Sequence, residues 1–259
     1  MTASAVAGLG TLLALMTAVW AASVARRDVS IVDIFWSLAI LAAACVYASG
    51  ADGLTLRRGV VLAAVGLWAV RLSGYLAWRG WGAAEDKRYR AMRERRPRFR
   101  WTSLFVVFWL QAALAWVVSL PLLAVMHVEE PDGSRLLDAL GALLFLVGFG
   151  FETAGDWQMA RFKADPANRG RVCDRGLWRF TRHPNYFGEA VLWWGLWCLA
   201  GTAPGTYWTV VGPLLLTWLL LRVSGVRLLE SDLLREKPAY RDYVARTSAF
   251  LPRPPRRDR

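Results

Sequence analysis

The sequence predicts an all-α, polytopic integral membrane protein with seven transmembrane helices. Hydrophobic residues make up 56% of the 259-residue chain, which also holds 15 tryptophans and has a mean hydropathy of +0.30. This composition is too apolar for an ordinary soluble domain. Apolar runs long enough to cross a hydrocarbon core of about 30 Å recur along the whole chain. They predict helices at residues 4–25, 30–49, 58–78, 101–126, 136–160, 186–202 and 205–228.

The first apolar run has the length of a secretory signal, but it lacks a basic start and a convincing cleavage site before Arg26. It is therefore expected to remain as a transmembrane helix. Residues 1–259 are expected to form a single domain, with a disordered tail at 253–259. The three cysteines are scattered, so they predict neither a disulfide framework nor a metal site.

The basic residues predict the orientation in the membrane. The net charge is +12, but Lys and Arg are concentrated in separate segments: nine in 79–100, seven in 161–182 and ten in 222–259. Such partition by loop argues against a nucleic-acid partner. By the positive-inside rule, the three segments are cytoplasmic, the N-terminus is outside and the C-terminus is inside. The excess of Arg over Lys favours a bacterial source, and therefore the cytoplasmic (inner) membrane.

Ionisable residues inside the predicted helices are candidates for function, because such groups are costly in a bilayer. Asp33 lies at the start of the second helix, and a carboxyl group there can be protonated and act as a donor. An acid that reaches water or caps the helix is the alternative. Arg71 lies deep in the third helix with Trp68 and Tyr75 on its face. An ion pair with another helix is the alternative for Arg71.

Further polar residues cluster in the C-terminal half. Glu152 and Asp156 lie one turn apart on the fifth helix, beside glycines that permit close helix contact. Asn185 and Glu189 share a face at the start of the sixth helix, and Glu230 follows the seventh. With Asp33 and Arg71, these residues are expected to converge on one cavity. Its mouth would carry arginines suited to phosphates, namely Arg88, Arg171, Arg179 and Arg182. Its inner end would be apolar, so the cavity predicts a large anionic cofactor and a hydrophobic substrate.

His183 and Pro184 precede the sixth helix. Because Pro184 is suited to the first helical position, the positive end of that helix would face an anion, and His183 could donate to a phosphate or cap the helix. A structural role for His183 is the alternative.

Residues 182–189, Arg-His-Pro-Asn-Tyr-Phe-Gly-Glu, resemble the membrane steroid 5-alpha-reductase family. Arg171 and Gly-Leu-Trp at 176–178 precede this motif, and Leu-Glu at 229–230 and a Tyr-rich stretch follow it. The resemblance implies a seven-helix enzyme that uses NADPH to reduce the carbon–carbon double bond of a 3-oxo-4-ene steroid. It also implies that Asp156, Arg171, Asn185 and Glu189 bind the cofactor.

Asp33 corresponds to the family's acid near the substrate ketone, and Arg71 to its arginine on the third helix. Where the family has a Tyr partner for that acid, this chain has Trp68, so Tyr75 is the alternative donor. Glu152 stands where the family usually has Asn. The expected catalytic residues are Asp33, Trp68 and Tyr75. The expected cofactor-binding residues are Arg71, Arg88, Glu152, Asp156, Arg171, Arg182, His183, Asn185, Tyr186, Glu189 and Glu230.

In the expected reaction, hydride addition to an enone builds negative charge on the ketone oxygen, which a protonated Asp33 would stabilise. The expected partners are a steroid-like substrate and membrane lipid, with no obligate protein partner. An S-adenosylmethionine-dependent membrane methyltransferase, resembling isoprenylcysteine carboxyl and phospholipid methyltransferases, is the alternative enzyme. It shares the Arg-His-Pro-x-Tyr-x-Gly element, but lacks a counterpart for the acid pair on the fifth helix and for Glu189. A lipid-binding or transport protein is a third possibility, although no inverted repeat is evident.

Overall fold

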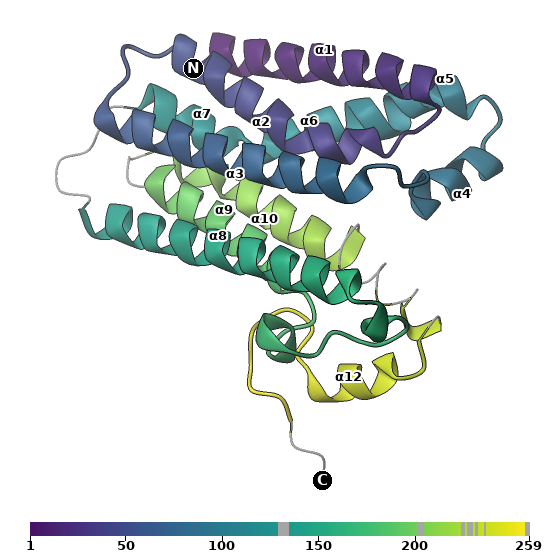
Figure 1. Cartoon of the computed structure of the whole chain (residues 1–259). Helices are drawn as coiled ribbons and strands as arrows, with labels where there is room; N and C mark the ends of the chain where they lie inside the picture. Colours follow the sequence, from purple (N-terminus) through teal and green to yellow (C-terminus); the bar gives the residue numbers. More distant parts are fainter. Residues whose placement is uncertain are drawn as a thin grey trace. The chain divides into compact units, whose positions relative to one another are not determined.

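Every secondary-structure element among the described residues is helical (Figure 1). In this computed structural model, the described residues are 1–128, 135–200, 205–223, 226, 230, 233–235 and 237–256. Contacts divide the chain into two compact units, and each is described by itself. Unit 1 comprises Met1–Glu130 and Ala203–Gly212, and unit 2 comprises Pro131–Thr202 and Pro213–Arg259. The single-domain prediction concerns the chain as a whole and stays a prediction.

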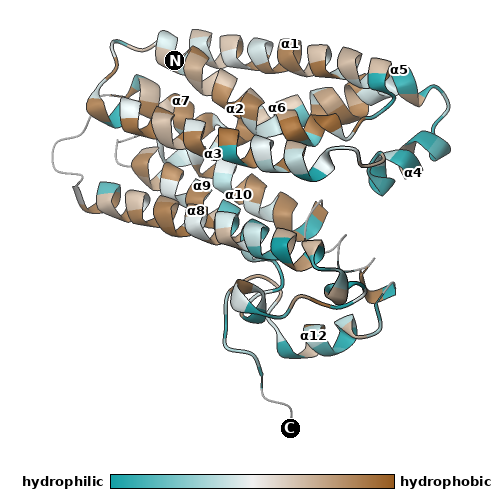
Figure 2. Ribbon diagram, in the orientation of Figure 1, coloured by the Kyte–Doolittle hydropathy of each residue, from teal (hydrophilic) through white to brown (hydrophobic). Residues whose placement is uncertain are grey.

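Five helices are long and apolar enough to cross a membrane: Thr2–Arg26, Ile31–Ser49, Leu56–Gly80, Phe99–Val118 and Leu136–Ala164. Their apolar residues dominate the helices in Figure 2. A shorter apolar helix spans Tyr207–Val223, and the sixth predicted run corresponds to the 17-residue helix α9, Pro184–Ala200. The ends of the sixth and seventh predicted runs, 201–202, 224–225 and 227–228, lie outside the described residues. The all-α class with several membrane-spanning candidates is therefore confirmed.

In unit 1, helices α1 (Thr2–Arg26), α2 (Ile31–Ser49) and α3 (Leu56–Gly80) pack in sequence order. The Ser37 hydroxyl donates to the Ala69 carbonyl at 3.1 Å and lies 2.9 Å from the Ser73 hydroxyl, so buried polar contacts hold α2 against α3. Gly8 permits close contact of α1 with α2, because a Cβ there would lie 2.3 Å from the Tyr47 ring.

The fourth predicted helix is interrupted in the structure. Helices α5 (Phe99–Ser103), η1 (Leu104–Trp109) and α6 (Leu110–Val118) run on from one another, and α7 (Leu120–His127) begins after Ser119. Pro121 has no backbone N–H to continue the hydrogen-bond ladder, which accounts for the break. The Ser119 hydroxyl lies 2.9 Å from that of Tyr47, so α2 braces the junction. Two more elements belong to unit 1: α4 (Lys87–Arg95) and η4 (Tyr207–Val210).

In unit 2, α8 (Arg135–Ala164) and α9 (Pro184–Ala200) pack through glycines. A Cβ on Gly148 would lie 2.4 Å from the Leu192 nitrogen, and a Cβ on Gly188 would lie 2.4 Å from the Glu152 nitrogen. The backbones therefore approach more closely than any larger residue would allow. The connection holds η2 (Pro166–Asn168) and η3 (Gly176–Arg179); α10 (Val211–Trp218), η5 (Leu219–Val223) and α12 (Tyr240–Arg246) follow.

The predicted disordered tail is attached to unit 2 over part of its length. The Arg253 backbone N–H donates to the Phe180 carbonyl at 2.9 Å, and that of Arg256 donates to the Arg246 carbonyl at 3.0 Å. Backbone hydrogen bonds therefore attach these two positions to the rest of unit 2, and disorder of the tail stays a prediction. Residues 257–259 lie outside the described residues.

Candidate functional site

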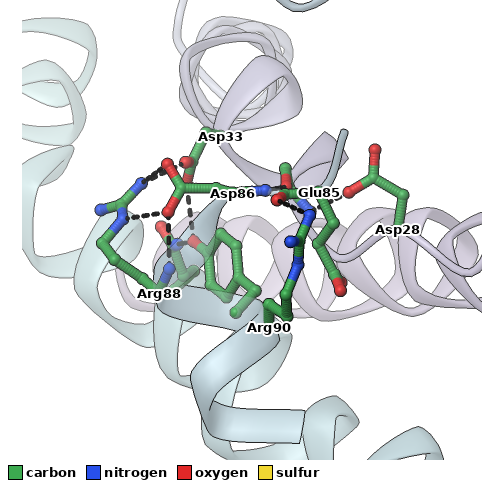
Figure 3. A network of polar contacts seen from close by, with 9 residues as sticks. Asp28, Asp33, Glu85, Asp86, Arg88 and Arg90 are labelled. Carbon is green, nitrogen blue, oxygen red and sulfur yellow. Dashed lines mark hydrogen bonds and ion pairs between the residues drawn. The ribbon is translucent and has the colours of Figure 1, made fainter. Parts of the chain in front are cut away.

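The first polar cluster joins α2 to α4 in unit 1 (Figure 3). Asp33 lies in the first turn of α2, and α4 is capped by Asp86, whose carboxylate accepts from the Arg88 backbone N–H at 2.8 Å. One oxygen of Asp33 forms an ion pair with Arg88 at 3.0 Å. The other accepts a hydrogen bond from the Tyr89 hydroxyl at 2.8 Å. Both oxygens of the Asp33 carboxylate are thus engaged by consecutive residues of α4.

Several contacts fasten α4 to the α1–α2 connection. The Glu85 carboxylate accepts from the Val29 backbone N–H at 2.9 Å and from Arg93 at 2.6 Å. The Asp86 backbone N–H donates to the Ser30 hydroxyl at 2.7 Å. Together these contacts place the start of α4 over the start of α2.

Electrostatics keep this cluster in defined protonation states. Burial raises the pKa of the Tyr89 phenol, and the negative charge of Asp33 raises it further, so this hydroxyl stays protonated. Burial also raises the pKa of Glu85, but the hydrogen bonds from Arg93 and Val29 outweigh it, and the pKa lies below its ordinary range. The cluster therefore combines the ionised Glu85 carboxylate with a protonated phenol.

Asp33 is not a lone acid in this structure, because Arg88 supplies a positive charge that no sequence neighbour provides. Its role as a protonated donor stays a prediction. The roles of Trp68 and Tyr75, the two candidate donors beside Asp33, stay predictions. Trp68 is completely buried and packs edge-on against Trp36, with ring centroids 6.5 Å apart. Tyr75 is half-buried and lies beside Trp78, with ring centroids 6.0 Å apart. The phenol that contacts Asp33 is Tyr89, and Arg71 is half-buried on α3.

The second cluster is a row of buried polar residues along α8 and α9 in unit 2. Glu152, Asp156 and Glu189 have relative exposures of only 2%, 6% and 9%. The Asn185 amide donates to the Asp156 carboxylate at 3.2 Å, which joins the two helices. A Cβ on Gly155 would lie 3.1 Å from the Asn185 nitrogen, so the glycine permits this approach. Three carboxyl groups and an amide are thus gathered on one apolar helix pair.

The third cluster surrounds Arg182 in unit 2. Its guanidinium donates to both oxygens of Glu230, at 2.7 and 3.0 Å, and also to the backbone carbonyls of Val244 and Thr247. His183 Nε2 lies 3.1 Å from Glu230, and the imidazole stacks on the Tyr186 ring with centroids 5.4 Å apart. These contacts tie the start of α9 to the C-terminal segment.

Burial raises the pKa of Glu230, but the hydrogen bonds from His183 and Arg182 outweigh it, so the pKa lies below its ordinary range. Burial raises the pKa of Tyr243, whose hydroxyl donates to the Trp178 carbonyl. In this structure the Arg182 guanidinium therefore contacts Glu230 and backbone carbonyls, which indicates a structural role. The alternative that His183 is structural is favoured for the same reason. The predicted phosphate contact of Arg182 stays a prediction.

Five exposed arginines of unit 2 lie at the end of α8 and on the α8–α9 connection. They are Arg161, Arg169, Arg171, Arg175 and Arg179. The Arg171 carbonyl accepts from the Lys237 ammonium group at 2.8 Å, which fixes the backbone at this point. Of the predicted arginines at the mouth of the cavity, Arg171 and Arg179 therefore keep side chains on the surface.

The structure brings the predicted residues together in three groups: Asp33 with Arg88; Asp156 with Asn185, on the helices that carry Glu152 and Glu189; and Arg182 with His183, Tyr186 and Glu230. The expected convergence of all of them on one cavity involves both units and stays a prediction. Sequence reasoning missed Tyr89 and Gln111, whose amide lies 3.5 Å from the Tyr89 hydroxyl. In the sequence, Tyr89 could have been found only because it follows Arg88, which was a predicted site residue.

Comparison with known proteins gives a family without an assigned activity. The family model described as "Protein of unknown function (DUF1295)" matches residues 19–247. The chain is 26% identical over 277 residues to "Uncharacterized protein C594.04c" of Schizosaccharomyces pombe, an alignment that covers 96% of this chain and 79% of the relative. No solved structure matches the chain.

Proposed function

The chain belongs to this DUF1295 family, and from that premise we propose that it is an NADPH-dependent membrane reductase. Its proposed reaction reduces the C4–C5 double bond of 3-oxo-4-ene steroids or related enone lipids. The proposal includes the finer topology: seven spans, an outer N-terminus, a cytoplasmic C-terminus and a bacterial inner membrane, as the loop charges favour.

The observation that carries the proposal is the buried row of Glu152, Asp156, Asn185 and Glu189 on α8 and α9. A helix pair that needed only to pack could do so through its glycines and apolar side chains. Carboxyl groups at such positions are costly, and they are typical of ligand or ion sites. The resemblance of residues 182–189 to steroid 5-alpha-reductases gives the ligand: a nicotinamide nucleotide.

The residue types of this row fit the polar parts of such a cofactor. Carboxylates and amides bind ribose hydroxyls and carboxamides, and exposed arginines such as Arg171 and Arg179 bind phosphates bidentately. In this assignment Asp156 and Asn185 orient the nucleotide, and Arg182, His183 and Glu230 hold the start of α9 in position. When bound, NADPH supplies the hydride that is added to the β-carbon of the enone.

On the substrate side, we assign the donor role to Tyr89. Hydride addition leaves negative charge on the ketone oxygen, and a protonated phenol in a buried site is suited to donate to it. The hydroxyl turns from Asp33 to the ketone oxygen, while Asp33 keeps Arg88 and α4 in place. A proton from solvent then completes the product at the α-carbon. This assignment answers the question left by Trp68, whose indole cannot supply a proton.

The contact between His183 and Glu230 also suits the second candidate, an S-adenosylmethionine-dependent methyltransferase. That class shares the Arg-His-Pro element and a later Glu before a Tyr-rich end, and the structure holds these parts together. The acids on α8 and Glu189 have no role in the methyltransferase reading. The reductase is therefore the proposal, and the methyltransferase is an outcome of the test.

The test is ligand-induced stabilisation of the purified full chain in detergent. A ligand at about 100 times its Kd stabilises the folded state by ~2.7 kcal/mol. We expect NADPH to raise Tm, S-adenosylmethionine to leave it unchanged, and NADPH oxidation to follow addition of a 4-ene-3-one. Asn185→Ala should weaken the NADPH response, and the matched control Asp174→Asn, at an exposed site of the same unit, should not. Stabilisation by S-adenosylmethionine alone would refute the reductase.

A further inference from the structure

One end of unit 1 gathers four separate segments. The Trp20 indole of α1 donates to the Arg100 carbonyl of α5 at 3.1 Å, and Arg93 of α4 donates to the Arg27 carbonyl at 3.5 Å. The Val29 contact with Glu85 adds the start of α2. The end of α1, the start of α2, helix α4 and the start of α5 therefore form one surface, seen as the hydrophilic region around α4 and α5 in Figure 2.

This surface carries mostly positive charge. Residues 78–101 contain nine basic and three acidic residues. Two of the acids are engaged in ion pairs. Asp86 pairs with Arg88, as Figure 3 shows, and Glu85 pairs with Arg93. Glu94 is the one acid of this segment that is exposed. The exposed arginines of this segment, which we name the basic collar, are Arg79, Arg90, Arg95, Arg96, Arg98 and Arg100.

Exposed indoles accompany the basic collar. Trp78, Trp81 and Trp101 are 64%, 88% and 56% exposed. The Arg100 guanidinium lies over the Trp101 ring, 5.1 Å from its centroid. Tryptophan is typical of the bilayer interface, where the ring meets apolar chains and the N–H meets water and headgroups. Indoles this exposed indicate that the surface lies at headgroup depth rather than in bulk water.

The positions of the spans support the same depth. The third candidate span ends at Gly80 and the fourth begins at Phe99, so the segment between them leaves and rejoins the membrane at one interface. At that depth the anions present in quantity are lipid phosphates. Guanidinium groups bind phosphates through paired N–H donors. We propose that the basic collar binds the headgroups of anionic phospholipids, independently of the proposed reductase reaction.

The experiment uses the full chain, delipidated in a neutral detergent and titrated with phosphatidylglycerol or phosphatidylcholine of the same acyl chains. Bound lipid is counted by native mass spectrometry. Each Arg near an anionic headgroup contributes about fivefold in affinity. The variant R95Q/R96Q/R98Q/R100Q should therefore bind phosphatidylglycerol at least ~10-fold more weakly, with phosphatidylcholine binding unchanged.

The matched control R169Q/R175Q/R241Q/R253Q removes the same charge from exposed positions of unit 2 and should keep phosphatidylglycerol binding. Equal losses in both variants would mean that net charge alone is responsible, and would overturn the proposal. The four-Lys version of the collar variant should retain binding, which separates lost charge from misfolding. If the four-Gln variant does not fold, the salt dependence of the wild-type chain tests the proposal instead. Phosphatidylglycerol should bind more weakly at about 0.5 M NaCl than at about 0.05 M NaCl, because salt screens the attraction between charges. Equal binding at the two salt concentrations would overturn the proposal.

Two further arms separate this site from others. Inorganic phosphate should not displace bound phosphatidylglycerol, and displacement at millimolar phosphate would show a small-anion site instead. The Tm response to NADPH should be the same in the collar variant and in the wild type. A failed NADPH response in both, with lipid selectivity intact, would refute the reductase and leave the basic collar standing.

Discussion

Replacing Arg182 by Met tests whether this residue holds unit 2 together rather than binding a cofactor phosphate. Arg182 and Glu230 have side-chain exposures of 8% and 16%. The substitution removes two charge-assisted hydrogen bonds to Glu230 and two hydrogen bonds to the carbonyls of Val244 and Thr247. Met fills a similar volume but leaves the largely buried Glu230 carboxylate with its contact to His183 and without its guanidinium partner.

The expected loss follows from that unpaired charge. Removing one partner of a buried ion pair costs about 3–5 kcal/mol, and the partial exposure of Glu230 favours the lower end. For a chain of this length, each kcal/mol lowers Tm by about 2–4 °C, so the loss is about 6–12 °C. The double variant R182M/E230L should lose less than Arg182→Met alone, because it leaves no carboxylate to neutralise.

Thermal unfolding in detergent measures the loss, and limited proteolysis after Arg241 measures release of the C-terminal segment. Arg175→Met, at an exposed position of the same connection, is the matched control and should change neither. A Tm drop below ~2 °C for Arg182→Met, together with loss of NADPH stabilisation, would refute the structural reading. That result would indicate that Arg182 binds the cofactor.

Three other substitutions test separate parts of the structure. Tyr89→Phe should lower turnover of a 4-ene-3-one about 10²-fold or more, as loss of one oxyanion donor does; the same loss in Tyr75→Phe, with Tyr89→Phe unaffected, would show the assignment to be wrong. Gly188→Ala should destabilise unit 2, because its Cβ would lie 2.4 Å from the Glu152 nitrogen, whereas the control Gly150→Ala meets no atom within 4 Å. The pKa of Glu230 lies below its ordinary range. Its contribution to the free energy of unfolding is therefore fully present above that range and is lost as the pH falls through the lowered pKa. A Tm that falls on acidification equally in wild type and Glu230→Gln would contradict this.

The helices themselves were predictable, because apolar length is a property of the local sequence. The first three predicted runs differ from α1, α2 and α3 by a few residues at each end. The break at Ser119 was also within reach, since Pro121 interrupts the backbone ladder of any helix. The packing of α8 on α9 was indicated by the glycine spacing, as Gly148 and Gly155 both meet α9 closely.

Partners across the chain were not predictable in the same way. Asp33 and Tyr89 are 56 positions apart, and their contact depends on how α4 folds back over α2. No periodicity specifies that return, because residues 81–86 are not helical. Asp156 and Asn185 were each singled out as polar residues in apolar helices, but their contact across 29 positions needed the close approach at Gly155.

Pairing of charges decides which residues remain available for chemistry. Arg88 is paired with Asp33 and Asp86, and Arg182 is paired with Glu230, so two of the four arginines expected to bind phosphate form ion pairs within their own units. A carboxylate and a guanidinium paired in this way stabilise the local fold and offer little to a ligand. The phenol of Tyr89 and the acids buried on α8 and α9 are different. The Tyr89 hydroxyl donates to Asp33 and can rotate its O–H toward a ligand oxygen, and a carboxyl group has acceptors for a hydroxyl or an amide. Activity should therefore depend most steeply on Tyr89, Asp156 and Asn185, while changes at Arg88 and Arg182 should act through stability.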